Sequence, residues 1–276
     1  MIDFSLQIPT KIYFGRDSLS HLDEEVRHYG DRVLLVYGGG SIKRIGLYDK
    51  VMEVLNEQSC RVWEISGVKP NPRLGLVQEG AALCKEQQIQ LVLAVGGGSV
   101  IDTAKAIANA ACYDGDPWDL FDGTCKNDRV LPLGVIVTIP AAGSEMSDSS
   151  VITRESDLCK RGRNTPLNYP KFSILNPEYT YSLPSFQTAC GAVDIMAHMM
   201  ERYFTNTACG ADRPHDRRRT ENRHPQRPYC VDAPGKLRCA GRDHVGGRAG
   251  AQRSAGYRPR HRLGQSPFGA RAERPL

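Results

Sequence analysis

The sequence lacks any long apolar run, and this absence excludes several classes of protein. Its apolar stretches fall well short of the roughly 18–20 residues that a membrane-spanning helix needs. The N-terminal segment also has no basic stretch followed by an apolar one, so we expect no secretory signal. The nine cysteines include no C-x-x-C pair, which favours reduced thiols over a disulfide scaffold or a zinc ribbon. We therefore expect a cytoplasmic protein of one large or two ordinary domains, without a membrane partner.

Charge and apolar residues are distributed unevenly along the chain. Residues 1–207 carry 20 Lys and Arg against 25 Asp and Glu, whereas residues 208–276 carry 16 against 6. The second segment has 15 Arg but only six residues from Ile, Leu, Val, Met and Phe. So little apolar surface cannot offset the entropy cost of ordering a backbone. We therefore expect residues 208–276 to form a basic tail without a packed core.

The first 183 residues alternate between strand-like and helix-like segments. Arg32–Tyr37 is a continuous apolar run, typical of a strand buried on both faces. Further strands are expected at 61–65, 90–95 and 133–139, and helices at 51–58, 74–88 and 99–111. This alternation predicts an α/β domain over residues 1–183, with a parallel sheet and right-handed crossovers. A long helical segment at 185–203 has no strand after it, so residues 184–207 are expected to open a helical domain.

Two glycine-rich turns directly follow predicted strands. They are formed by Gly38, Gly39, Gly40 and Ser41, and by Gly96, Gly97, Gly98 and Ser99. Glycines let a backbone approach a phosphate closely, and the N-terminus of a helix favours an anion. Ser99 can cap the helix that starts there, so each turn alone could also be a plain connection. Because both turns leave the carboxyl edge of one parallel sheet, together they predict a nucleotide site, although the spacing is not the G-x-G-x-x-G fingerprint.

Asp194 and His198 are four residues apart in the long helical segment. They would share one face of the helix, so both could reach one metal ion. The alternative is an ordinary polar pair on an amphipathic helix.

Four segments in order give the chain a family resemblance: GGGSVIDTAKA, TIPAAGSEMSDSSVIT, KFSILNPEYTYSLP and GAVDIMAHMMERYF. Together with the opening PTKIYFG, they resemble the iron-containing (group III) alcohol dehydrogenases over residues 1 to about 207. Within this family the chain is similar to the NADPH-dependent butanol dehydrogenase and aldehyde reductase branch. The resemblance implies a dehydroquinate synthase-like architecture, in which a nucleotide-binding α/β domain precedes an all-helical metal-binding domain. Dehydroquinate synthase-like or glycerol dehydrogenase-like chemistry shares the sheet pattern, but the second and third segments favour the alcohol dehydrogenases.

The resemblance implies roles for individual residues. Gly96 to Ser99 match the pyrophosphate-binding turn, and Asp102 follows in the same motif. The other coenzyme-binding positions it implies are Thr138 and Ser144 in the lining loop, Asn71 near the adenosine ribose and Lys160 near the nicotinamide end. Asp194 and His198 match the first two of four metal ligands, Asp-His-His-His, for Fe²⁺ or Zn²⁺.

The resemblance also implies the substrates and the assembly. The reaction would be hydride transfer between NADP(H) and a primary alcohol or aldehyde such as butanol or butanal, in a homodimer of the intact family protein. NAD-selective relatives typically hold an acidic residue where this chain has glycine after the strand at 32–37. Ser41 and Lys43 are available there for a 2′-phosphate, which favours NADP(H).

The two remaining metal ligands have no match in residues 208–276. His215, His224, His244 and His261 stand in no family context. With permitted codons, one constant shift of one nucleotide allows YDARAEIMWAG over 237–247, GALAHNGLL over 247–256 and NRPLEHELSGL over 265–276. These strings contain both missing histidines in family context. We therefore interpret the tail as out of frame from near Thr207 and expect this chain to be truncated and inactive.

One alternative to the frame shift remains. The tail could be a genuine basic segment that attracts nucleic acid without sequence specificity. The chain would then be a non-catalytic nucleotide-binding fragment with a basic interaction tail.

Overall fold

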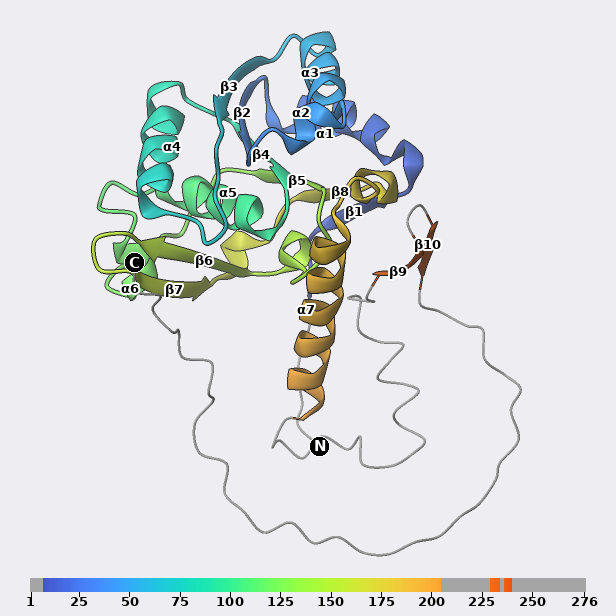
Figure 1. The fold of residues 1–276 in the computed structure, drawn as a ribbon. Coiled ribbons are helices and arrows are strands. Elements are labelled where there is room, and N and C mark those ends of the chain that lie inside the picture. The colour runs from blue at the N-terminus through green and yellow to red at the C-terminus, as the bar shows by residue number, and fades with distance from the viewer. Residues whose placement is uncertain (1–6, 205–228, 234–235, 240–276) are drawn as a thin grey trace, which may run out of the picture. The chain divides into compact units, whose positions relative to one another are not determined.

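The computed structural model describes residues 7–204, 229–233 and 236–239 (Figure 1). Its main sheet has six parallel strands in the order β1-β8-β5-β4-β2-β3. The strands are β1 (Lys11–Phe14), β2 (Arg32–Tyr37), β3 (Arg61–Ile65), β4 (Leu91–Gly96), β5 (Leu133–Val137) and β8 (Phe172–Leu175). The predicted parallel α/β fold is therefore confirmed.

Helices connect the strands and cover both faces of the sheet. They are α1 (Leu22–Tyr29), α2 (Ser41–Arg44), α3 (Leu47–Glu57), α4 (Leu74–Glu86), α5 (Gly98–Ala110), α6 (Asp119–Asp122) and α7 (Ser185–Tyr203). Short 3-10 helices are η1 (Arg16–His21), η2 (Ser144–Met146), η3 (Pro166–Asn168) and η4 (Pro177–Thr180). The helix expected at 51–58 begins four residues earlier, and the strand expected at 133–139 ends at Val137.

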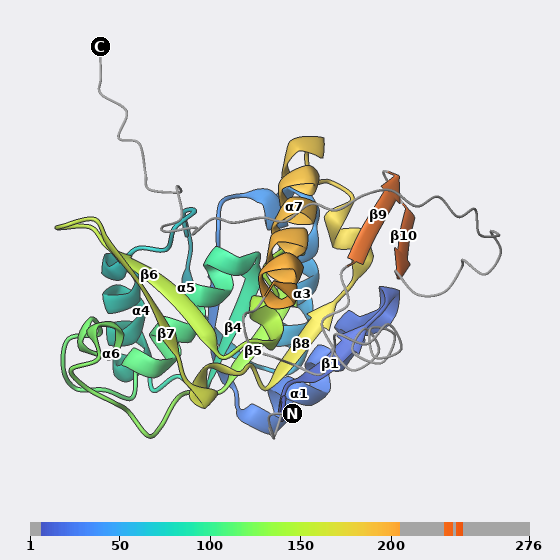
Figure 2. The same ribbon diagram turned by 90° about the horizontal axis from the view of Figure 1, so that it is seen from below.

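The alternation of side chains along β2 explains how the sheet supports two cores. Leu34 and Val36 pack with α4 and α5 on one face, whereas Val33 and Leu35 pack with α1 and α3 on the other (Figures 1 and 2). Side chains of a strand point alternately to opposite faces. Burial on both faces therefore requires the consecutive apolar residues that follow Arg32 in this strand.

A small second sheet lies beside α5. It is an antiparallel hairpin of β6 (Ser149–Arg154) and β7 (Cys159–Asn164). Arg163 on β7 donates to the Asn109 side chain on α5 at 2.9 Å. The backbone N–H of Thr153 on β6 donates to the carbonyl of Pro72 at 2.8 Å. These bonds fix the hairpin against the main domain, next to the segment that leads into α4.

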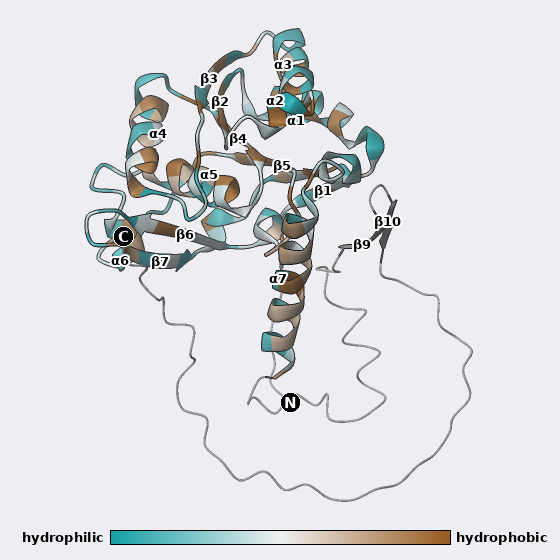
Figure 3. Cartoon of the chain, in the orientation of Figure 1, coloured by the Kyte–Doolittle hydropathy of each residue, from teal (hydrophilic) through white to brown (hydrophobic). Residues whose placement is uncertain are grey.

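Helix α7 has the bounds that the sequence predicts, and most of it is exposed. Its buried residue is Gly191, on which a Cβ would lie 2.7 Å from the carbonyl oxygen of Pro140. Apolar side chains are exposed along the helix, Phe186 to 72% and Met196 to 53% among the described residues. Figure 3 shows the hydropathy of the residues along α7. The absence of a Cβ at Gly191 therefore lets the helix backbone contact the segment after β5 directly.

Within the basic tail the structure describes an antiparallel pair, β9 (Tyr229–Ala233) and β10 (Lys236–Cys239). The remainder of the tail, and with it the expectation that residues 208–276 lack a packed core, lies outside the described residues. In the part of the chain that is described, no helix is long and apolar enough to cross a membrane.

We expect Gly134→Ala to lower the free energy of unfolding by about 1–3 kcal/mol, because it overpacks the core. A Cβ on Gly134 in β5 would lie 2.1 Å from the ring of Phe172, which is fully buried. Urea unfolding at equilibrium measures the change. Gly162→Ala in β7 is the control, because its nearest atom would be 3.7 Å away, and it should change stability by about 0.5 kcal/mol or less. Equal effects of the two variants would contradict this account of the core.

Candidate coenzyme site and metal-ligand pair

The two glycine turns lie side by side at the carboxyl edge of the sheet. Strands β2 and β4 are paired in parallel, with Tyr37 opposite Val95, so the turns leave adjacent strands. A Cβ on Gly96 would lie 2.6 Å from Val100, and one on Gly38 would lie 3.7 Å from the same side chain. Val100 thus fills the space between the turns and requires glycine at position 96. The prediction that both turns share one edge is confirmed.

The first turn of α5 offers free backbone donors. The N-cap is Gly97, and no side chain caps the helix, so the expectation that Ser99 caps it is wrong: Ser99 lies inside the helix. The N–H groups of Val100 and Ile101 both donate to the carbonyl of Gly97. The N–H groups of Gly98 and Ser99 have no acceptor among the described residues, as the start of a helix dictates. The space beside Gly98 is open, since nothing lies within 4 Å of a Cβ built on it.

The segment after β5 passes along the second glycine turn. Thr138 is buried, and its N–H donates to the carbonyl of Gly96 at 3.0 Å. A Cβ on Gly97 would lie 3.1 Å from Ile139. The predicted site residue Thr138 is therefore adjacent to the turn that Gly96 and Gly97 form, although its side chain is mostly covered.

Asp102 and Ser144, both predicted site residues, are joined directly. The Ser144 hydroxyl donates to Asp102 Oδ1 at 2.8 Å, and the Val151 N–H donates to Asp102 Oδ2 at 3.1 Å. Burial raises the pKa of Asp102, and the Ser144 hydrogen bond and the nearby Lys105 charge oppose that rise. Both oxygens of the Asp102 carboxylate thus accept hydrogen bonds from the protein, one from the loop that carries Ser144 and one from strand β6 of the hairpin.

Lys105 is a residue of this site that the sequence did not reveal. It is fully buried, and its ammonium lies 2.7–3.3 Å from five oxygens, the carbonyls and hydroxyls of Ser144 and Ser147 and the carbonyl of Ser149. Burial lowers the pKa of Lys105 to about 8, while Asp102, Glu145 and Asp148 favour its charged form. A lysine on a helix ordinarily indicates a solvated charge, so only its fully apolar flanks, Ala104 and Ala106, could have suggested burial.

Asn71 and Lys160 are 89 residues apart in sequence and form a hydrogen bond of 2.8 Å. Asn71 adopts a left-handed backbone conformation with φ 58°, which asparagine tolerates better than most residues. Lys160 lies on β7 opposite Thr153. The resemblance places these two residues at opposite ends of the coenzyme. The structure brings the two side chains into direct contact, and their placement along the coenzyme stays a prediction.

Asp194 and His198 lie on one face of α7, as expected, with Oδ1 and Nε2 3.9 Å apart. Both side chains are nearly half exposed. Carboxylate oxygen and imidazole nitrogen are suitable ligands for Fe²⁺ or Zn²⁺. Among the described residues no third His, Cys, Asp or Glu joins them, and a catalytic site needs at least three protein ligands. The pair fits a metal chemically but is not a complete site, and His215, His224, His244 and His261 lie outside the described residues.

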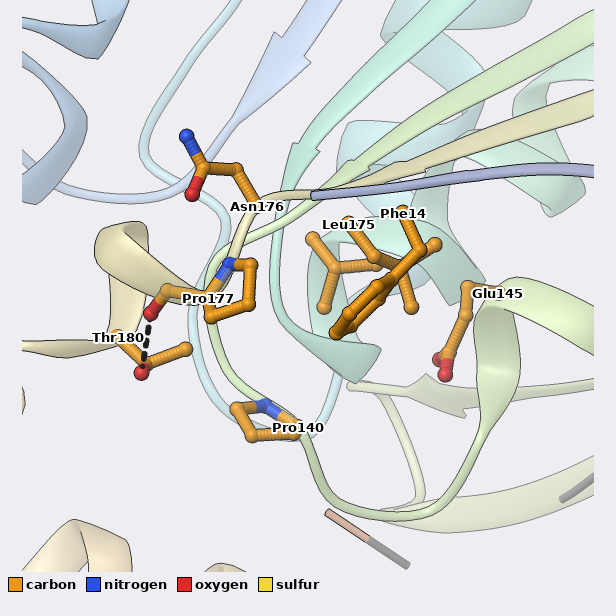
Figure 4. A pocket seen from close by; sticks show the side chains of 8 residues that line it. Phe14, Pro140, Glu145, Leu175, Asn176, Pro177 and Thr180 are labelled. Atoms are coloured by element: carbon orange, nitrogen blue, oxygen red, sulfur yellow. Dashed lines mark hydrogen bonds between the residues drawn. The ribbon is translucent and has the colours of Figure 1, made fainter. Parts of the chain in front are cut away.

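A small cavity of about 30 Å³ lies at the same edge, where β1, β5 and β8 end (Figure 4). It is lined by Phe14, Val137, Pro140, Glu145, Leu175, Asn176, Pro177 and Thr180. Thr180 donates to the carbonyl of Pro177 at 2.7 Å, which closes one wall. Burial raises the pKa of Glu145. The cavity has room for about one water molecule beside a carboxyl group.

Comparison with known proteins agrees with this architecture. The family model for iron-containing alcohol dehydrogenase matches residues 9–177. The chain is 50% identical to NADH-dependent butanol dehydrogenase B of Clostridium acetobutylicum over 207 residues, which are 75% of this chain and 53% of that protein. It is 39% identical to the NADPH-dependent aldehyde reductase YqhD of Escherichia coli over 208 residues, 74% of this chain and 53% of the relative.

A solved structure gives the same result. The crystal structure of NADH-dependent butanol dehydrogenase A from Thermotoga maritima superposes with a TM-score of 0.75 at 41% identity, covering 80% of this chain and 55% of that one. The chain thus spans about half the length of the relatives that it matches. With its parallel sheet, paired glycine turns and Asp-His helix, it belongs to the iron-containing alcohol dehydrogenase family.

Proposed function

We propose that this chain carries the coenzyme-binding part of a metal-dependent alcohol dehydrogenase or aldehyde reductase. The reaction would transfer a hydride between a nicotinamide coenzyme and a primary alcohol or aldehyde, such as butanol or butanal. The observation that carries the proposal is the pair of glycine turns on adjacent strands, with the free N–H groups of Gly98 and Ser99 beside them. Free amides at a helix start are suited to a pyrophosphate.

The residues of this chain would bind and orient the reactants. Gly98 and Ser99 would hold the pyrophosphate, and Lys105 would keep the loop that carries Ser144 against α5. Asn71, near the adenosine ribose, and Lys160, toward the nicotinamide end, would contact the coenzyme, and their mutual hydrogen bond would hold both in place. Asp194 and His198 would be two of the metal ligands. When bound, the metal acts as a Lewis acid on the substrate oxygen, and the coenzyme carries the hydride.

We further propose that NADP(H) is preferred over NAD(H). Residues 38–41 include no acidic side chain. Gly39 is exposed, and nothing lies within 4 Å of a Cβ built on it, so a 2′-phosphate would meet no carboxylate of the turn itself. Relatives named for each coenzyme match the chain: butanol dehydrogenase B of Clostridium acetobutylicum is NADH-dependent and YqhD is NADPH-dependent. The preference of this chain therefore rests on the chemistry of its own turn.

A non-catalytic nucleotide-binding fragment is the second candidate. It is favoured by the metal-ligand pair, which is incomplete within the described residues. Nucleotide binding without turnover, in a version of the protein with its complete helical domain, would select this candidate.

Gly98→Ala tests the pyrophosphate site. The added methyl meets no protein atom within 4 Å, so the free energy of unfolding should be unchanged within about 0.5 kcal/mol. The methyl group would occupy the space that the coenzyme approaches. The affinities for NADPH and NADH should both fall by about tenfold or more, because charge-assisted hydrogen bonds to the pyrophosphate are lost. Fluorescence titration measures the affinities, with Gly162→Ala as control. Full affinity in Gly98→Ala would place the pyrophosphate elsewhere.

Gly39→Asp tests the coenzyme preference. Titration of the unmodified chain should show tighter binding of NADPH than of NADH. The substitution adds a carboxylate that repels the 2′-phosphate and accepts hydrogen bonds from ribose hydroxyls. It should therefore shift the preference toward NADH. Tighter binding of NADH by the unmodified chain would refute the NADP(H) proposal.

Turnover tests the completeness of the metal site. We expect the chain as written to be essentially inactive, because two ligands hold a divalent ion loosely. Correcting the reading frame by one nucleotide near the codon for Thr207 should restore activity. Both proteins are loaded with Fe²⁺ or Zn²⁺, and NADPH oxidation by butanal is followed. Comparable rates would show that residues 208–276 supply ligands, with His215, His224, His244 and His261 the residues to substitute next.

A further inference from the structure

Two basic residues follow the first glycine turn on α2, and their surroundings differ. The Lys43 ammonium lies 4.4 Å from the ring centroid of Tyr48 and 5.3 Å from that of Tyr37. The Tyr37 hydroxyl, and to a lesser extent the charges of Glu64 and Asp49, raise the pKa of Lys43. Aromatic faces and a carboxylate therefore already compensate the charge of Lys43.

Glu64 on β3 completes this cluster. The hydroxyls of Tyr37 and Tyr48 donate to its two carboxylate oxygens, each at 2.6 Å. Burial alone would raise the pKa of Glu64, but these two hydrogen bonds and the Lys43 charge bring it below its ordinary value. The Glu64 carboxylate is thus ionised, and each of its oxygens accepts a hydrogen bond from a tyrosine hydroxyl. Its charge is offset by Lys43, so it neither requires a ribose hydroxyl nor strongly repels a phosphate.

Arg44 is the last residue of α2, and its side chain lies beside the turn. Its side chain folds back toward the start of α2, as helical side chains do, and its Nη1 would be 3.7 Å from a Cβ built on Gly40. The side chain forms no ion pair with any residue that the structure describes. The space beside Gly39 is open, and Ser41 is exposed. An uncompensated guanidinium therefore borders the open part of the turn.

We propose that Arg44, rather than Lys43, pairs with the 2′-phosphate of NADPH and sets the coenzyme preference; this inference rests on the proposed function. The guanidinium has a planar fork of donors that matches a phosphate bidentately. Lys43 would have to leave two aromatic rings and the field of Glu64 to reach the same anion. Arg44 needs no such rearrangement, because its head already lies against Gly40.

Calorimetric titration of the full chain and its variants tests this assignment at one fixed ionic strength. The probes are NADPH, NADH, 2′,5′-ADP and ADP. The last two present the adenosine end alone, so they require neither a metal ion nor a nicotinamide site. Arg44→Ala is compared with Lys43→Ala, which removes the same charge from the same short helix.

Arg44→Ala should lower the affinity for NADPH and 2′,5′-ADP by about 10- to 100-fold, the range expected for a charge-assisted contact. Binding of NADH and ADP should change by less than about threefold, because they lack the 2′-phosphate, and Lys43→Ala should have a small effect on all four probes. Unchanged discrimination in Arg44→Ala, or an equal loss in Lys43→Ala, would overturn the assignment while leaving nucleotide binding intact. If none of the four probes binds the unmodified chain, the proposed function itself fails, and the assignment fails with it.

Discussion

The buried ammonium of Lys105 holds together the parts of this molecule that form the candidate site. It lies on α5, the helix whose first turn presents the free N–H groups of Gly98 and Ser99, and it binds the segment from Ser144 to Ser149 that leads into the β6–β7 hairpin. A buried ammonium without acceptors would cost several kcal/mol. The loop must therefore adopt the conformation that supplies five oxygens. One charge in the core thus determines the path of residues 144–149.

This constraint also explains how widely separated motifs come together. Ser144 accepts a hydrogen bond from Lys105 and donates one to Asp102. Asp102 in turn accepts from the backbone of Val151 on β6. The hairpin that follows brings Lys160 to Asn71. A chain of short polar contacts therefore extends from the glycine turn to the segment before α4.

The sequence predicts four of the six strands of the main sheet and misses the two shortest, β1 and β8. Strands β2, β4 and β5 are nearly continuous apolar runs because both faces are covered, and such runs are visible in a sequence. Strands β1 and β8 have only four residues each, too few to show a pattern, although β8 is fully buried. The edge strand β3 has the bounds that the sequence predicts. The β6–β7 hairpin depends on the polar contacts of Arg163 and Asn109, which no periodicity encodes. The hairpin is thus set by such tertiary contacts more than by local pattern.

The candidate site shows the same contrast between features that are local in the sequence and features that depend on tertiary contacts. The glycine turns and the i, i+4 spacing of Asp194 and His198 are local features, so the sequence revealed them. The role of Lys105, the contact between Asn71 and Lys160, and the difference between Lys43 and Arg44 depend on partners elsewhere in the chain. The N-cap was misassigned to Ser99 because a serine after glycines resembles a cap, whereas the helix begins one residue earlier, at Gly98.

The backbone contact between Gly191 and Pro140 has a mechanical consequence. The helix contacts the segment after β5 at this point, and Asp194 and His198 lie further along the helix, beyond the contact. At 1.5 Å of rise per residue, Asp194 is about 4.5 Å and His198 about 10 Å along the helix from that point. A tilt of about 10° would displace the two positions by only about 1 and 2 Å. The absence of a Cβ at Gly191 thus limits how far the Asp194 and His198 side chains can move relative to the segment after β5.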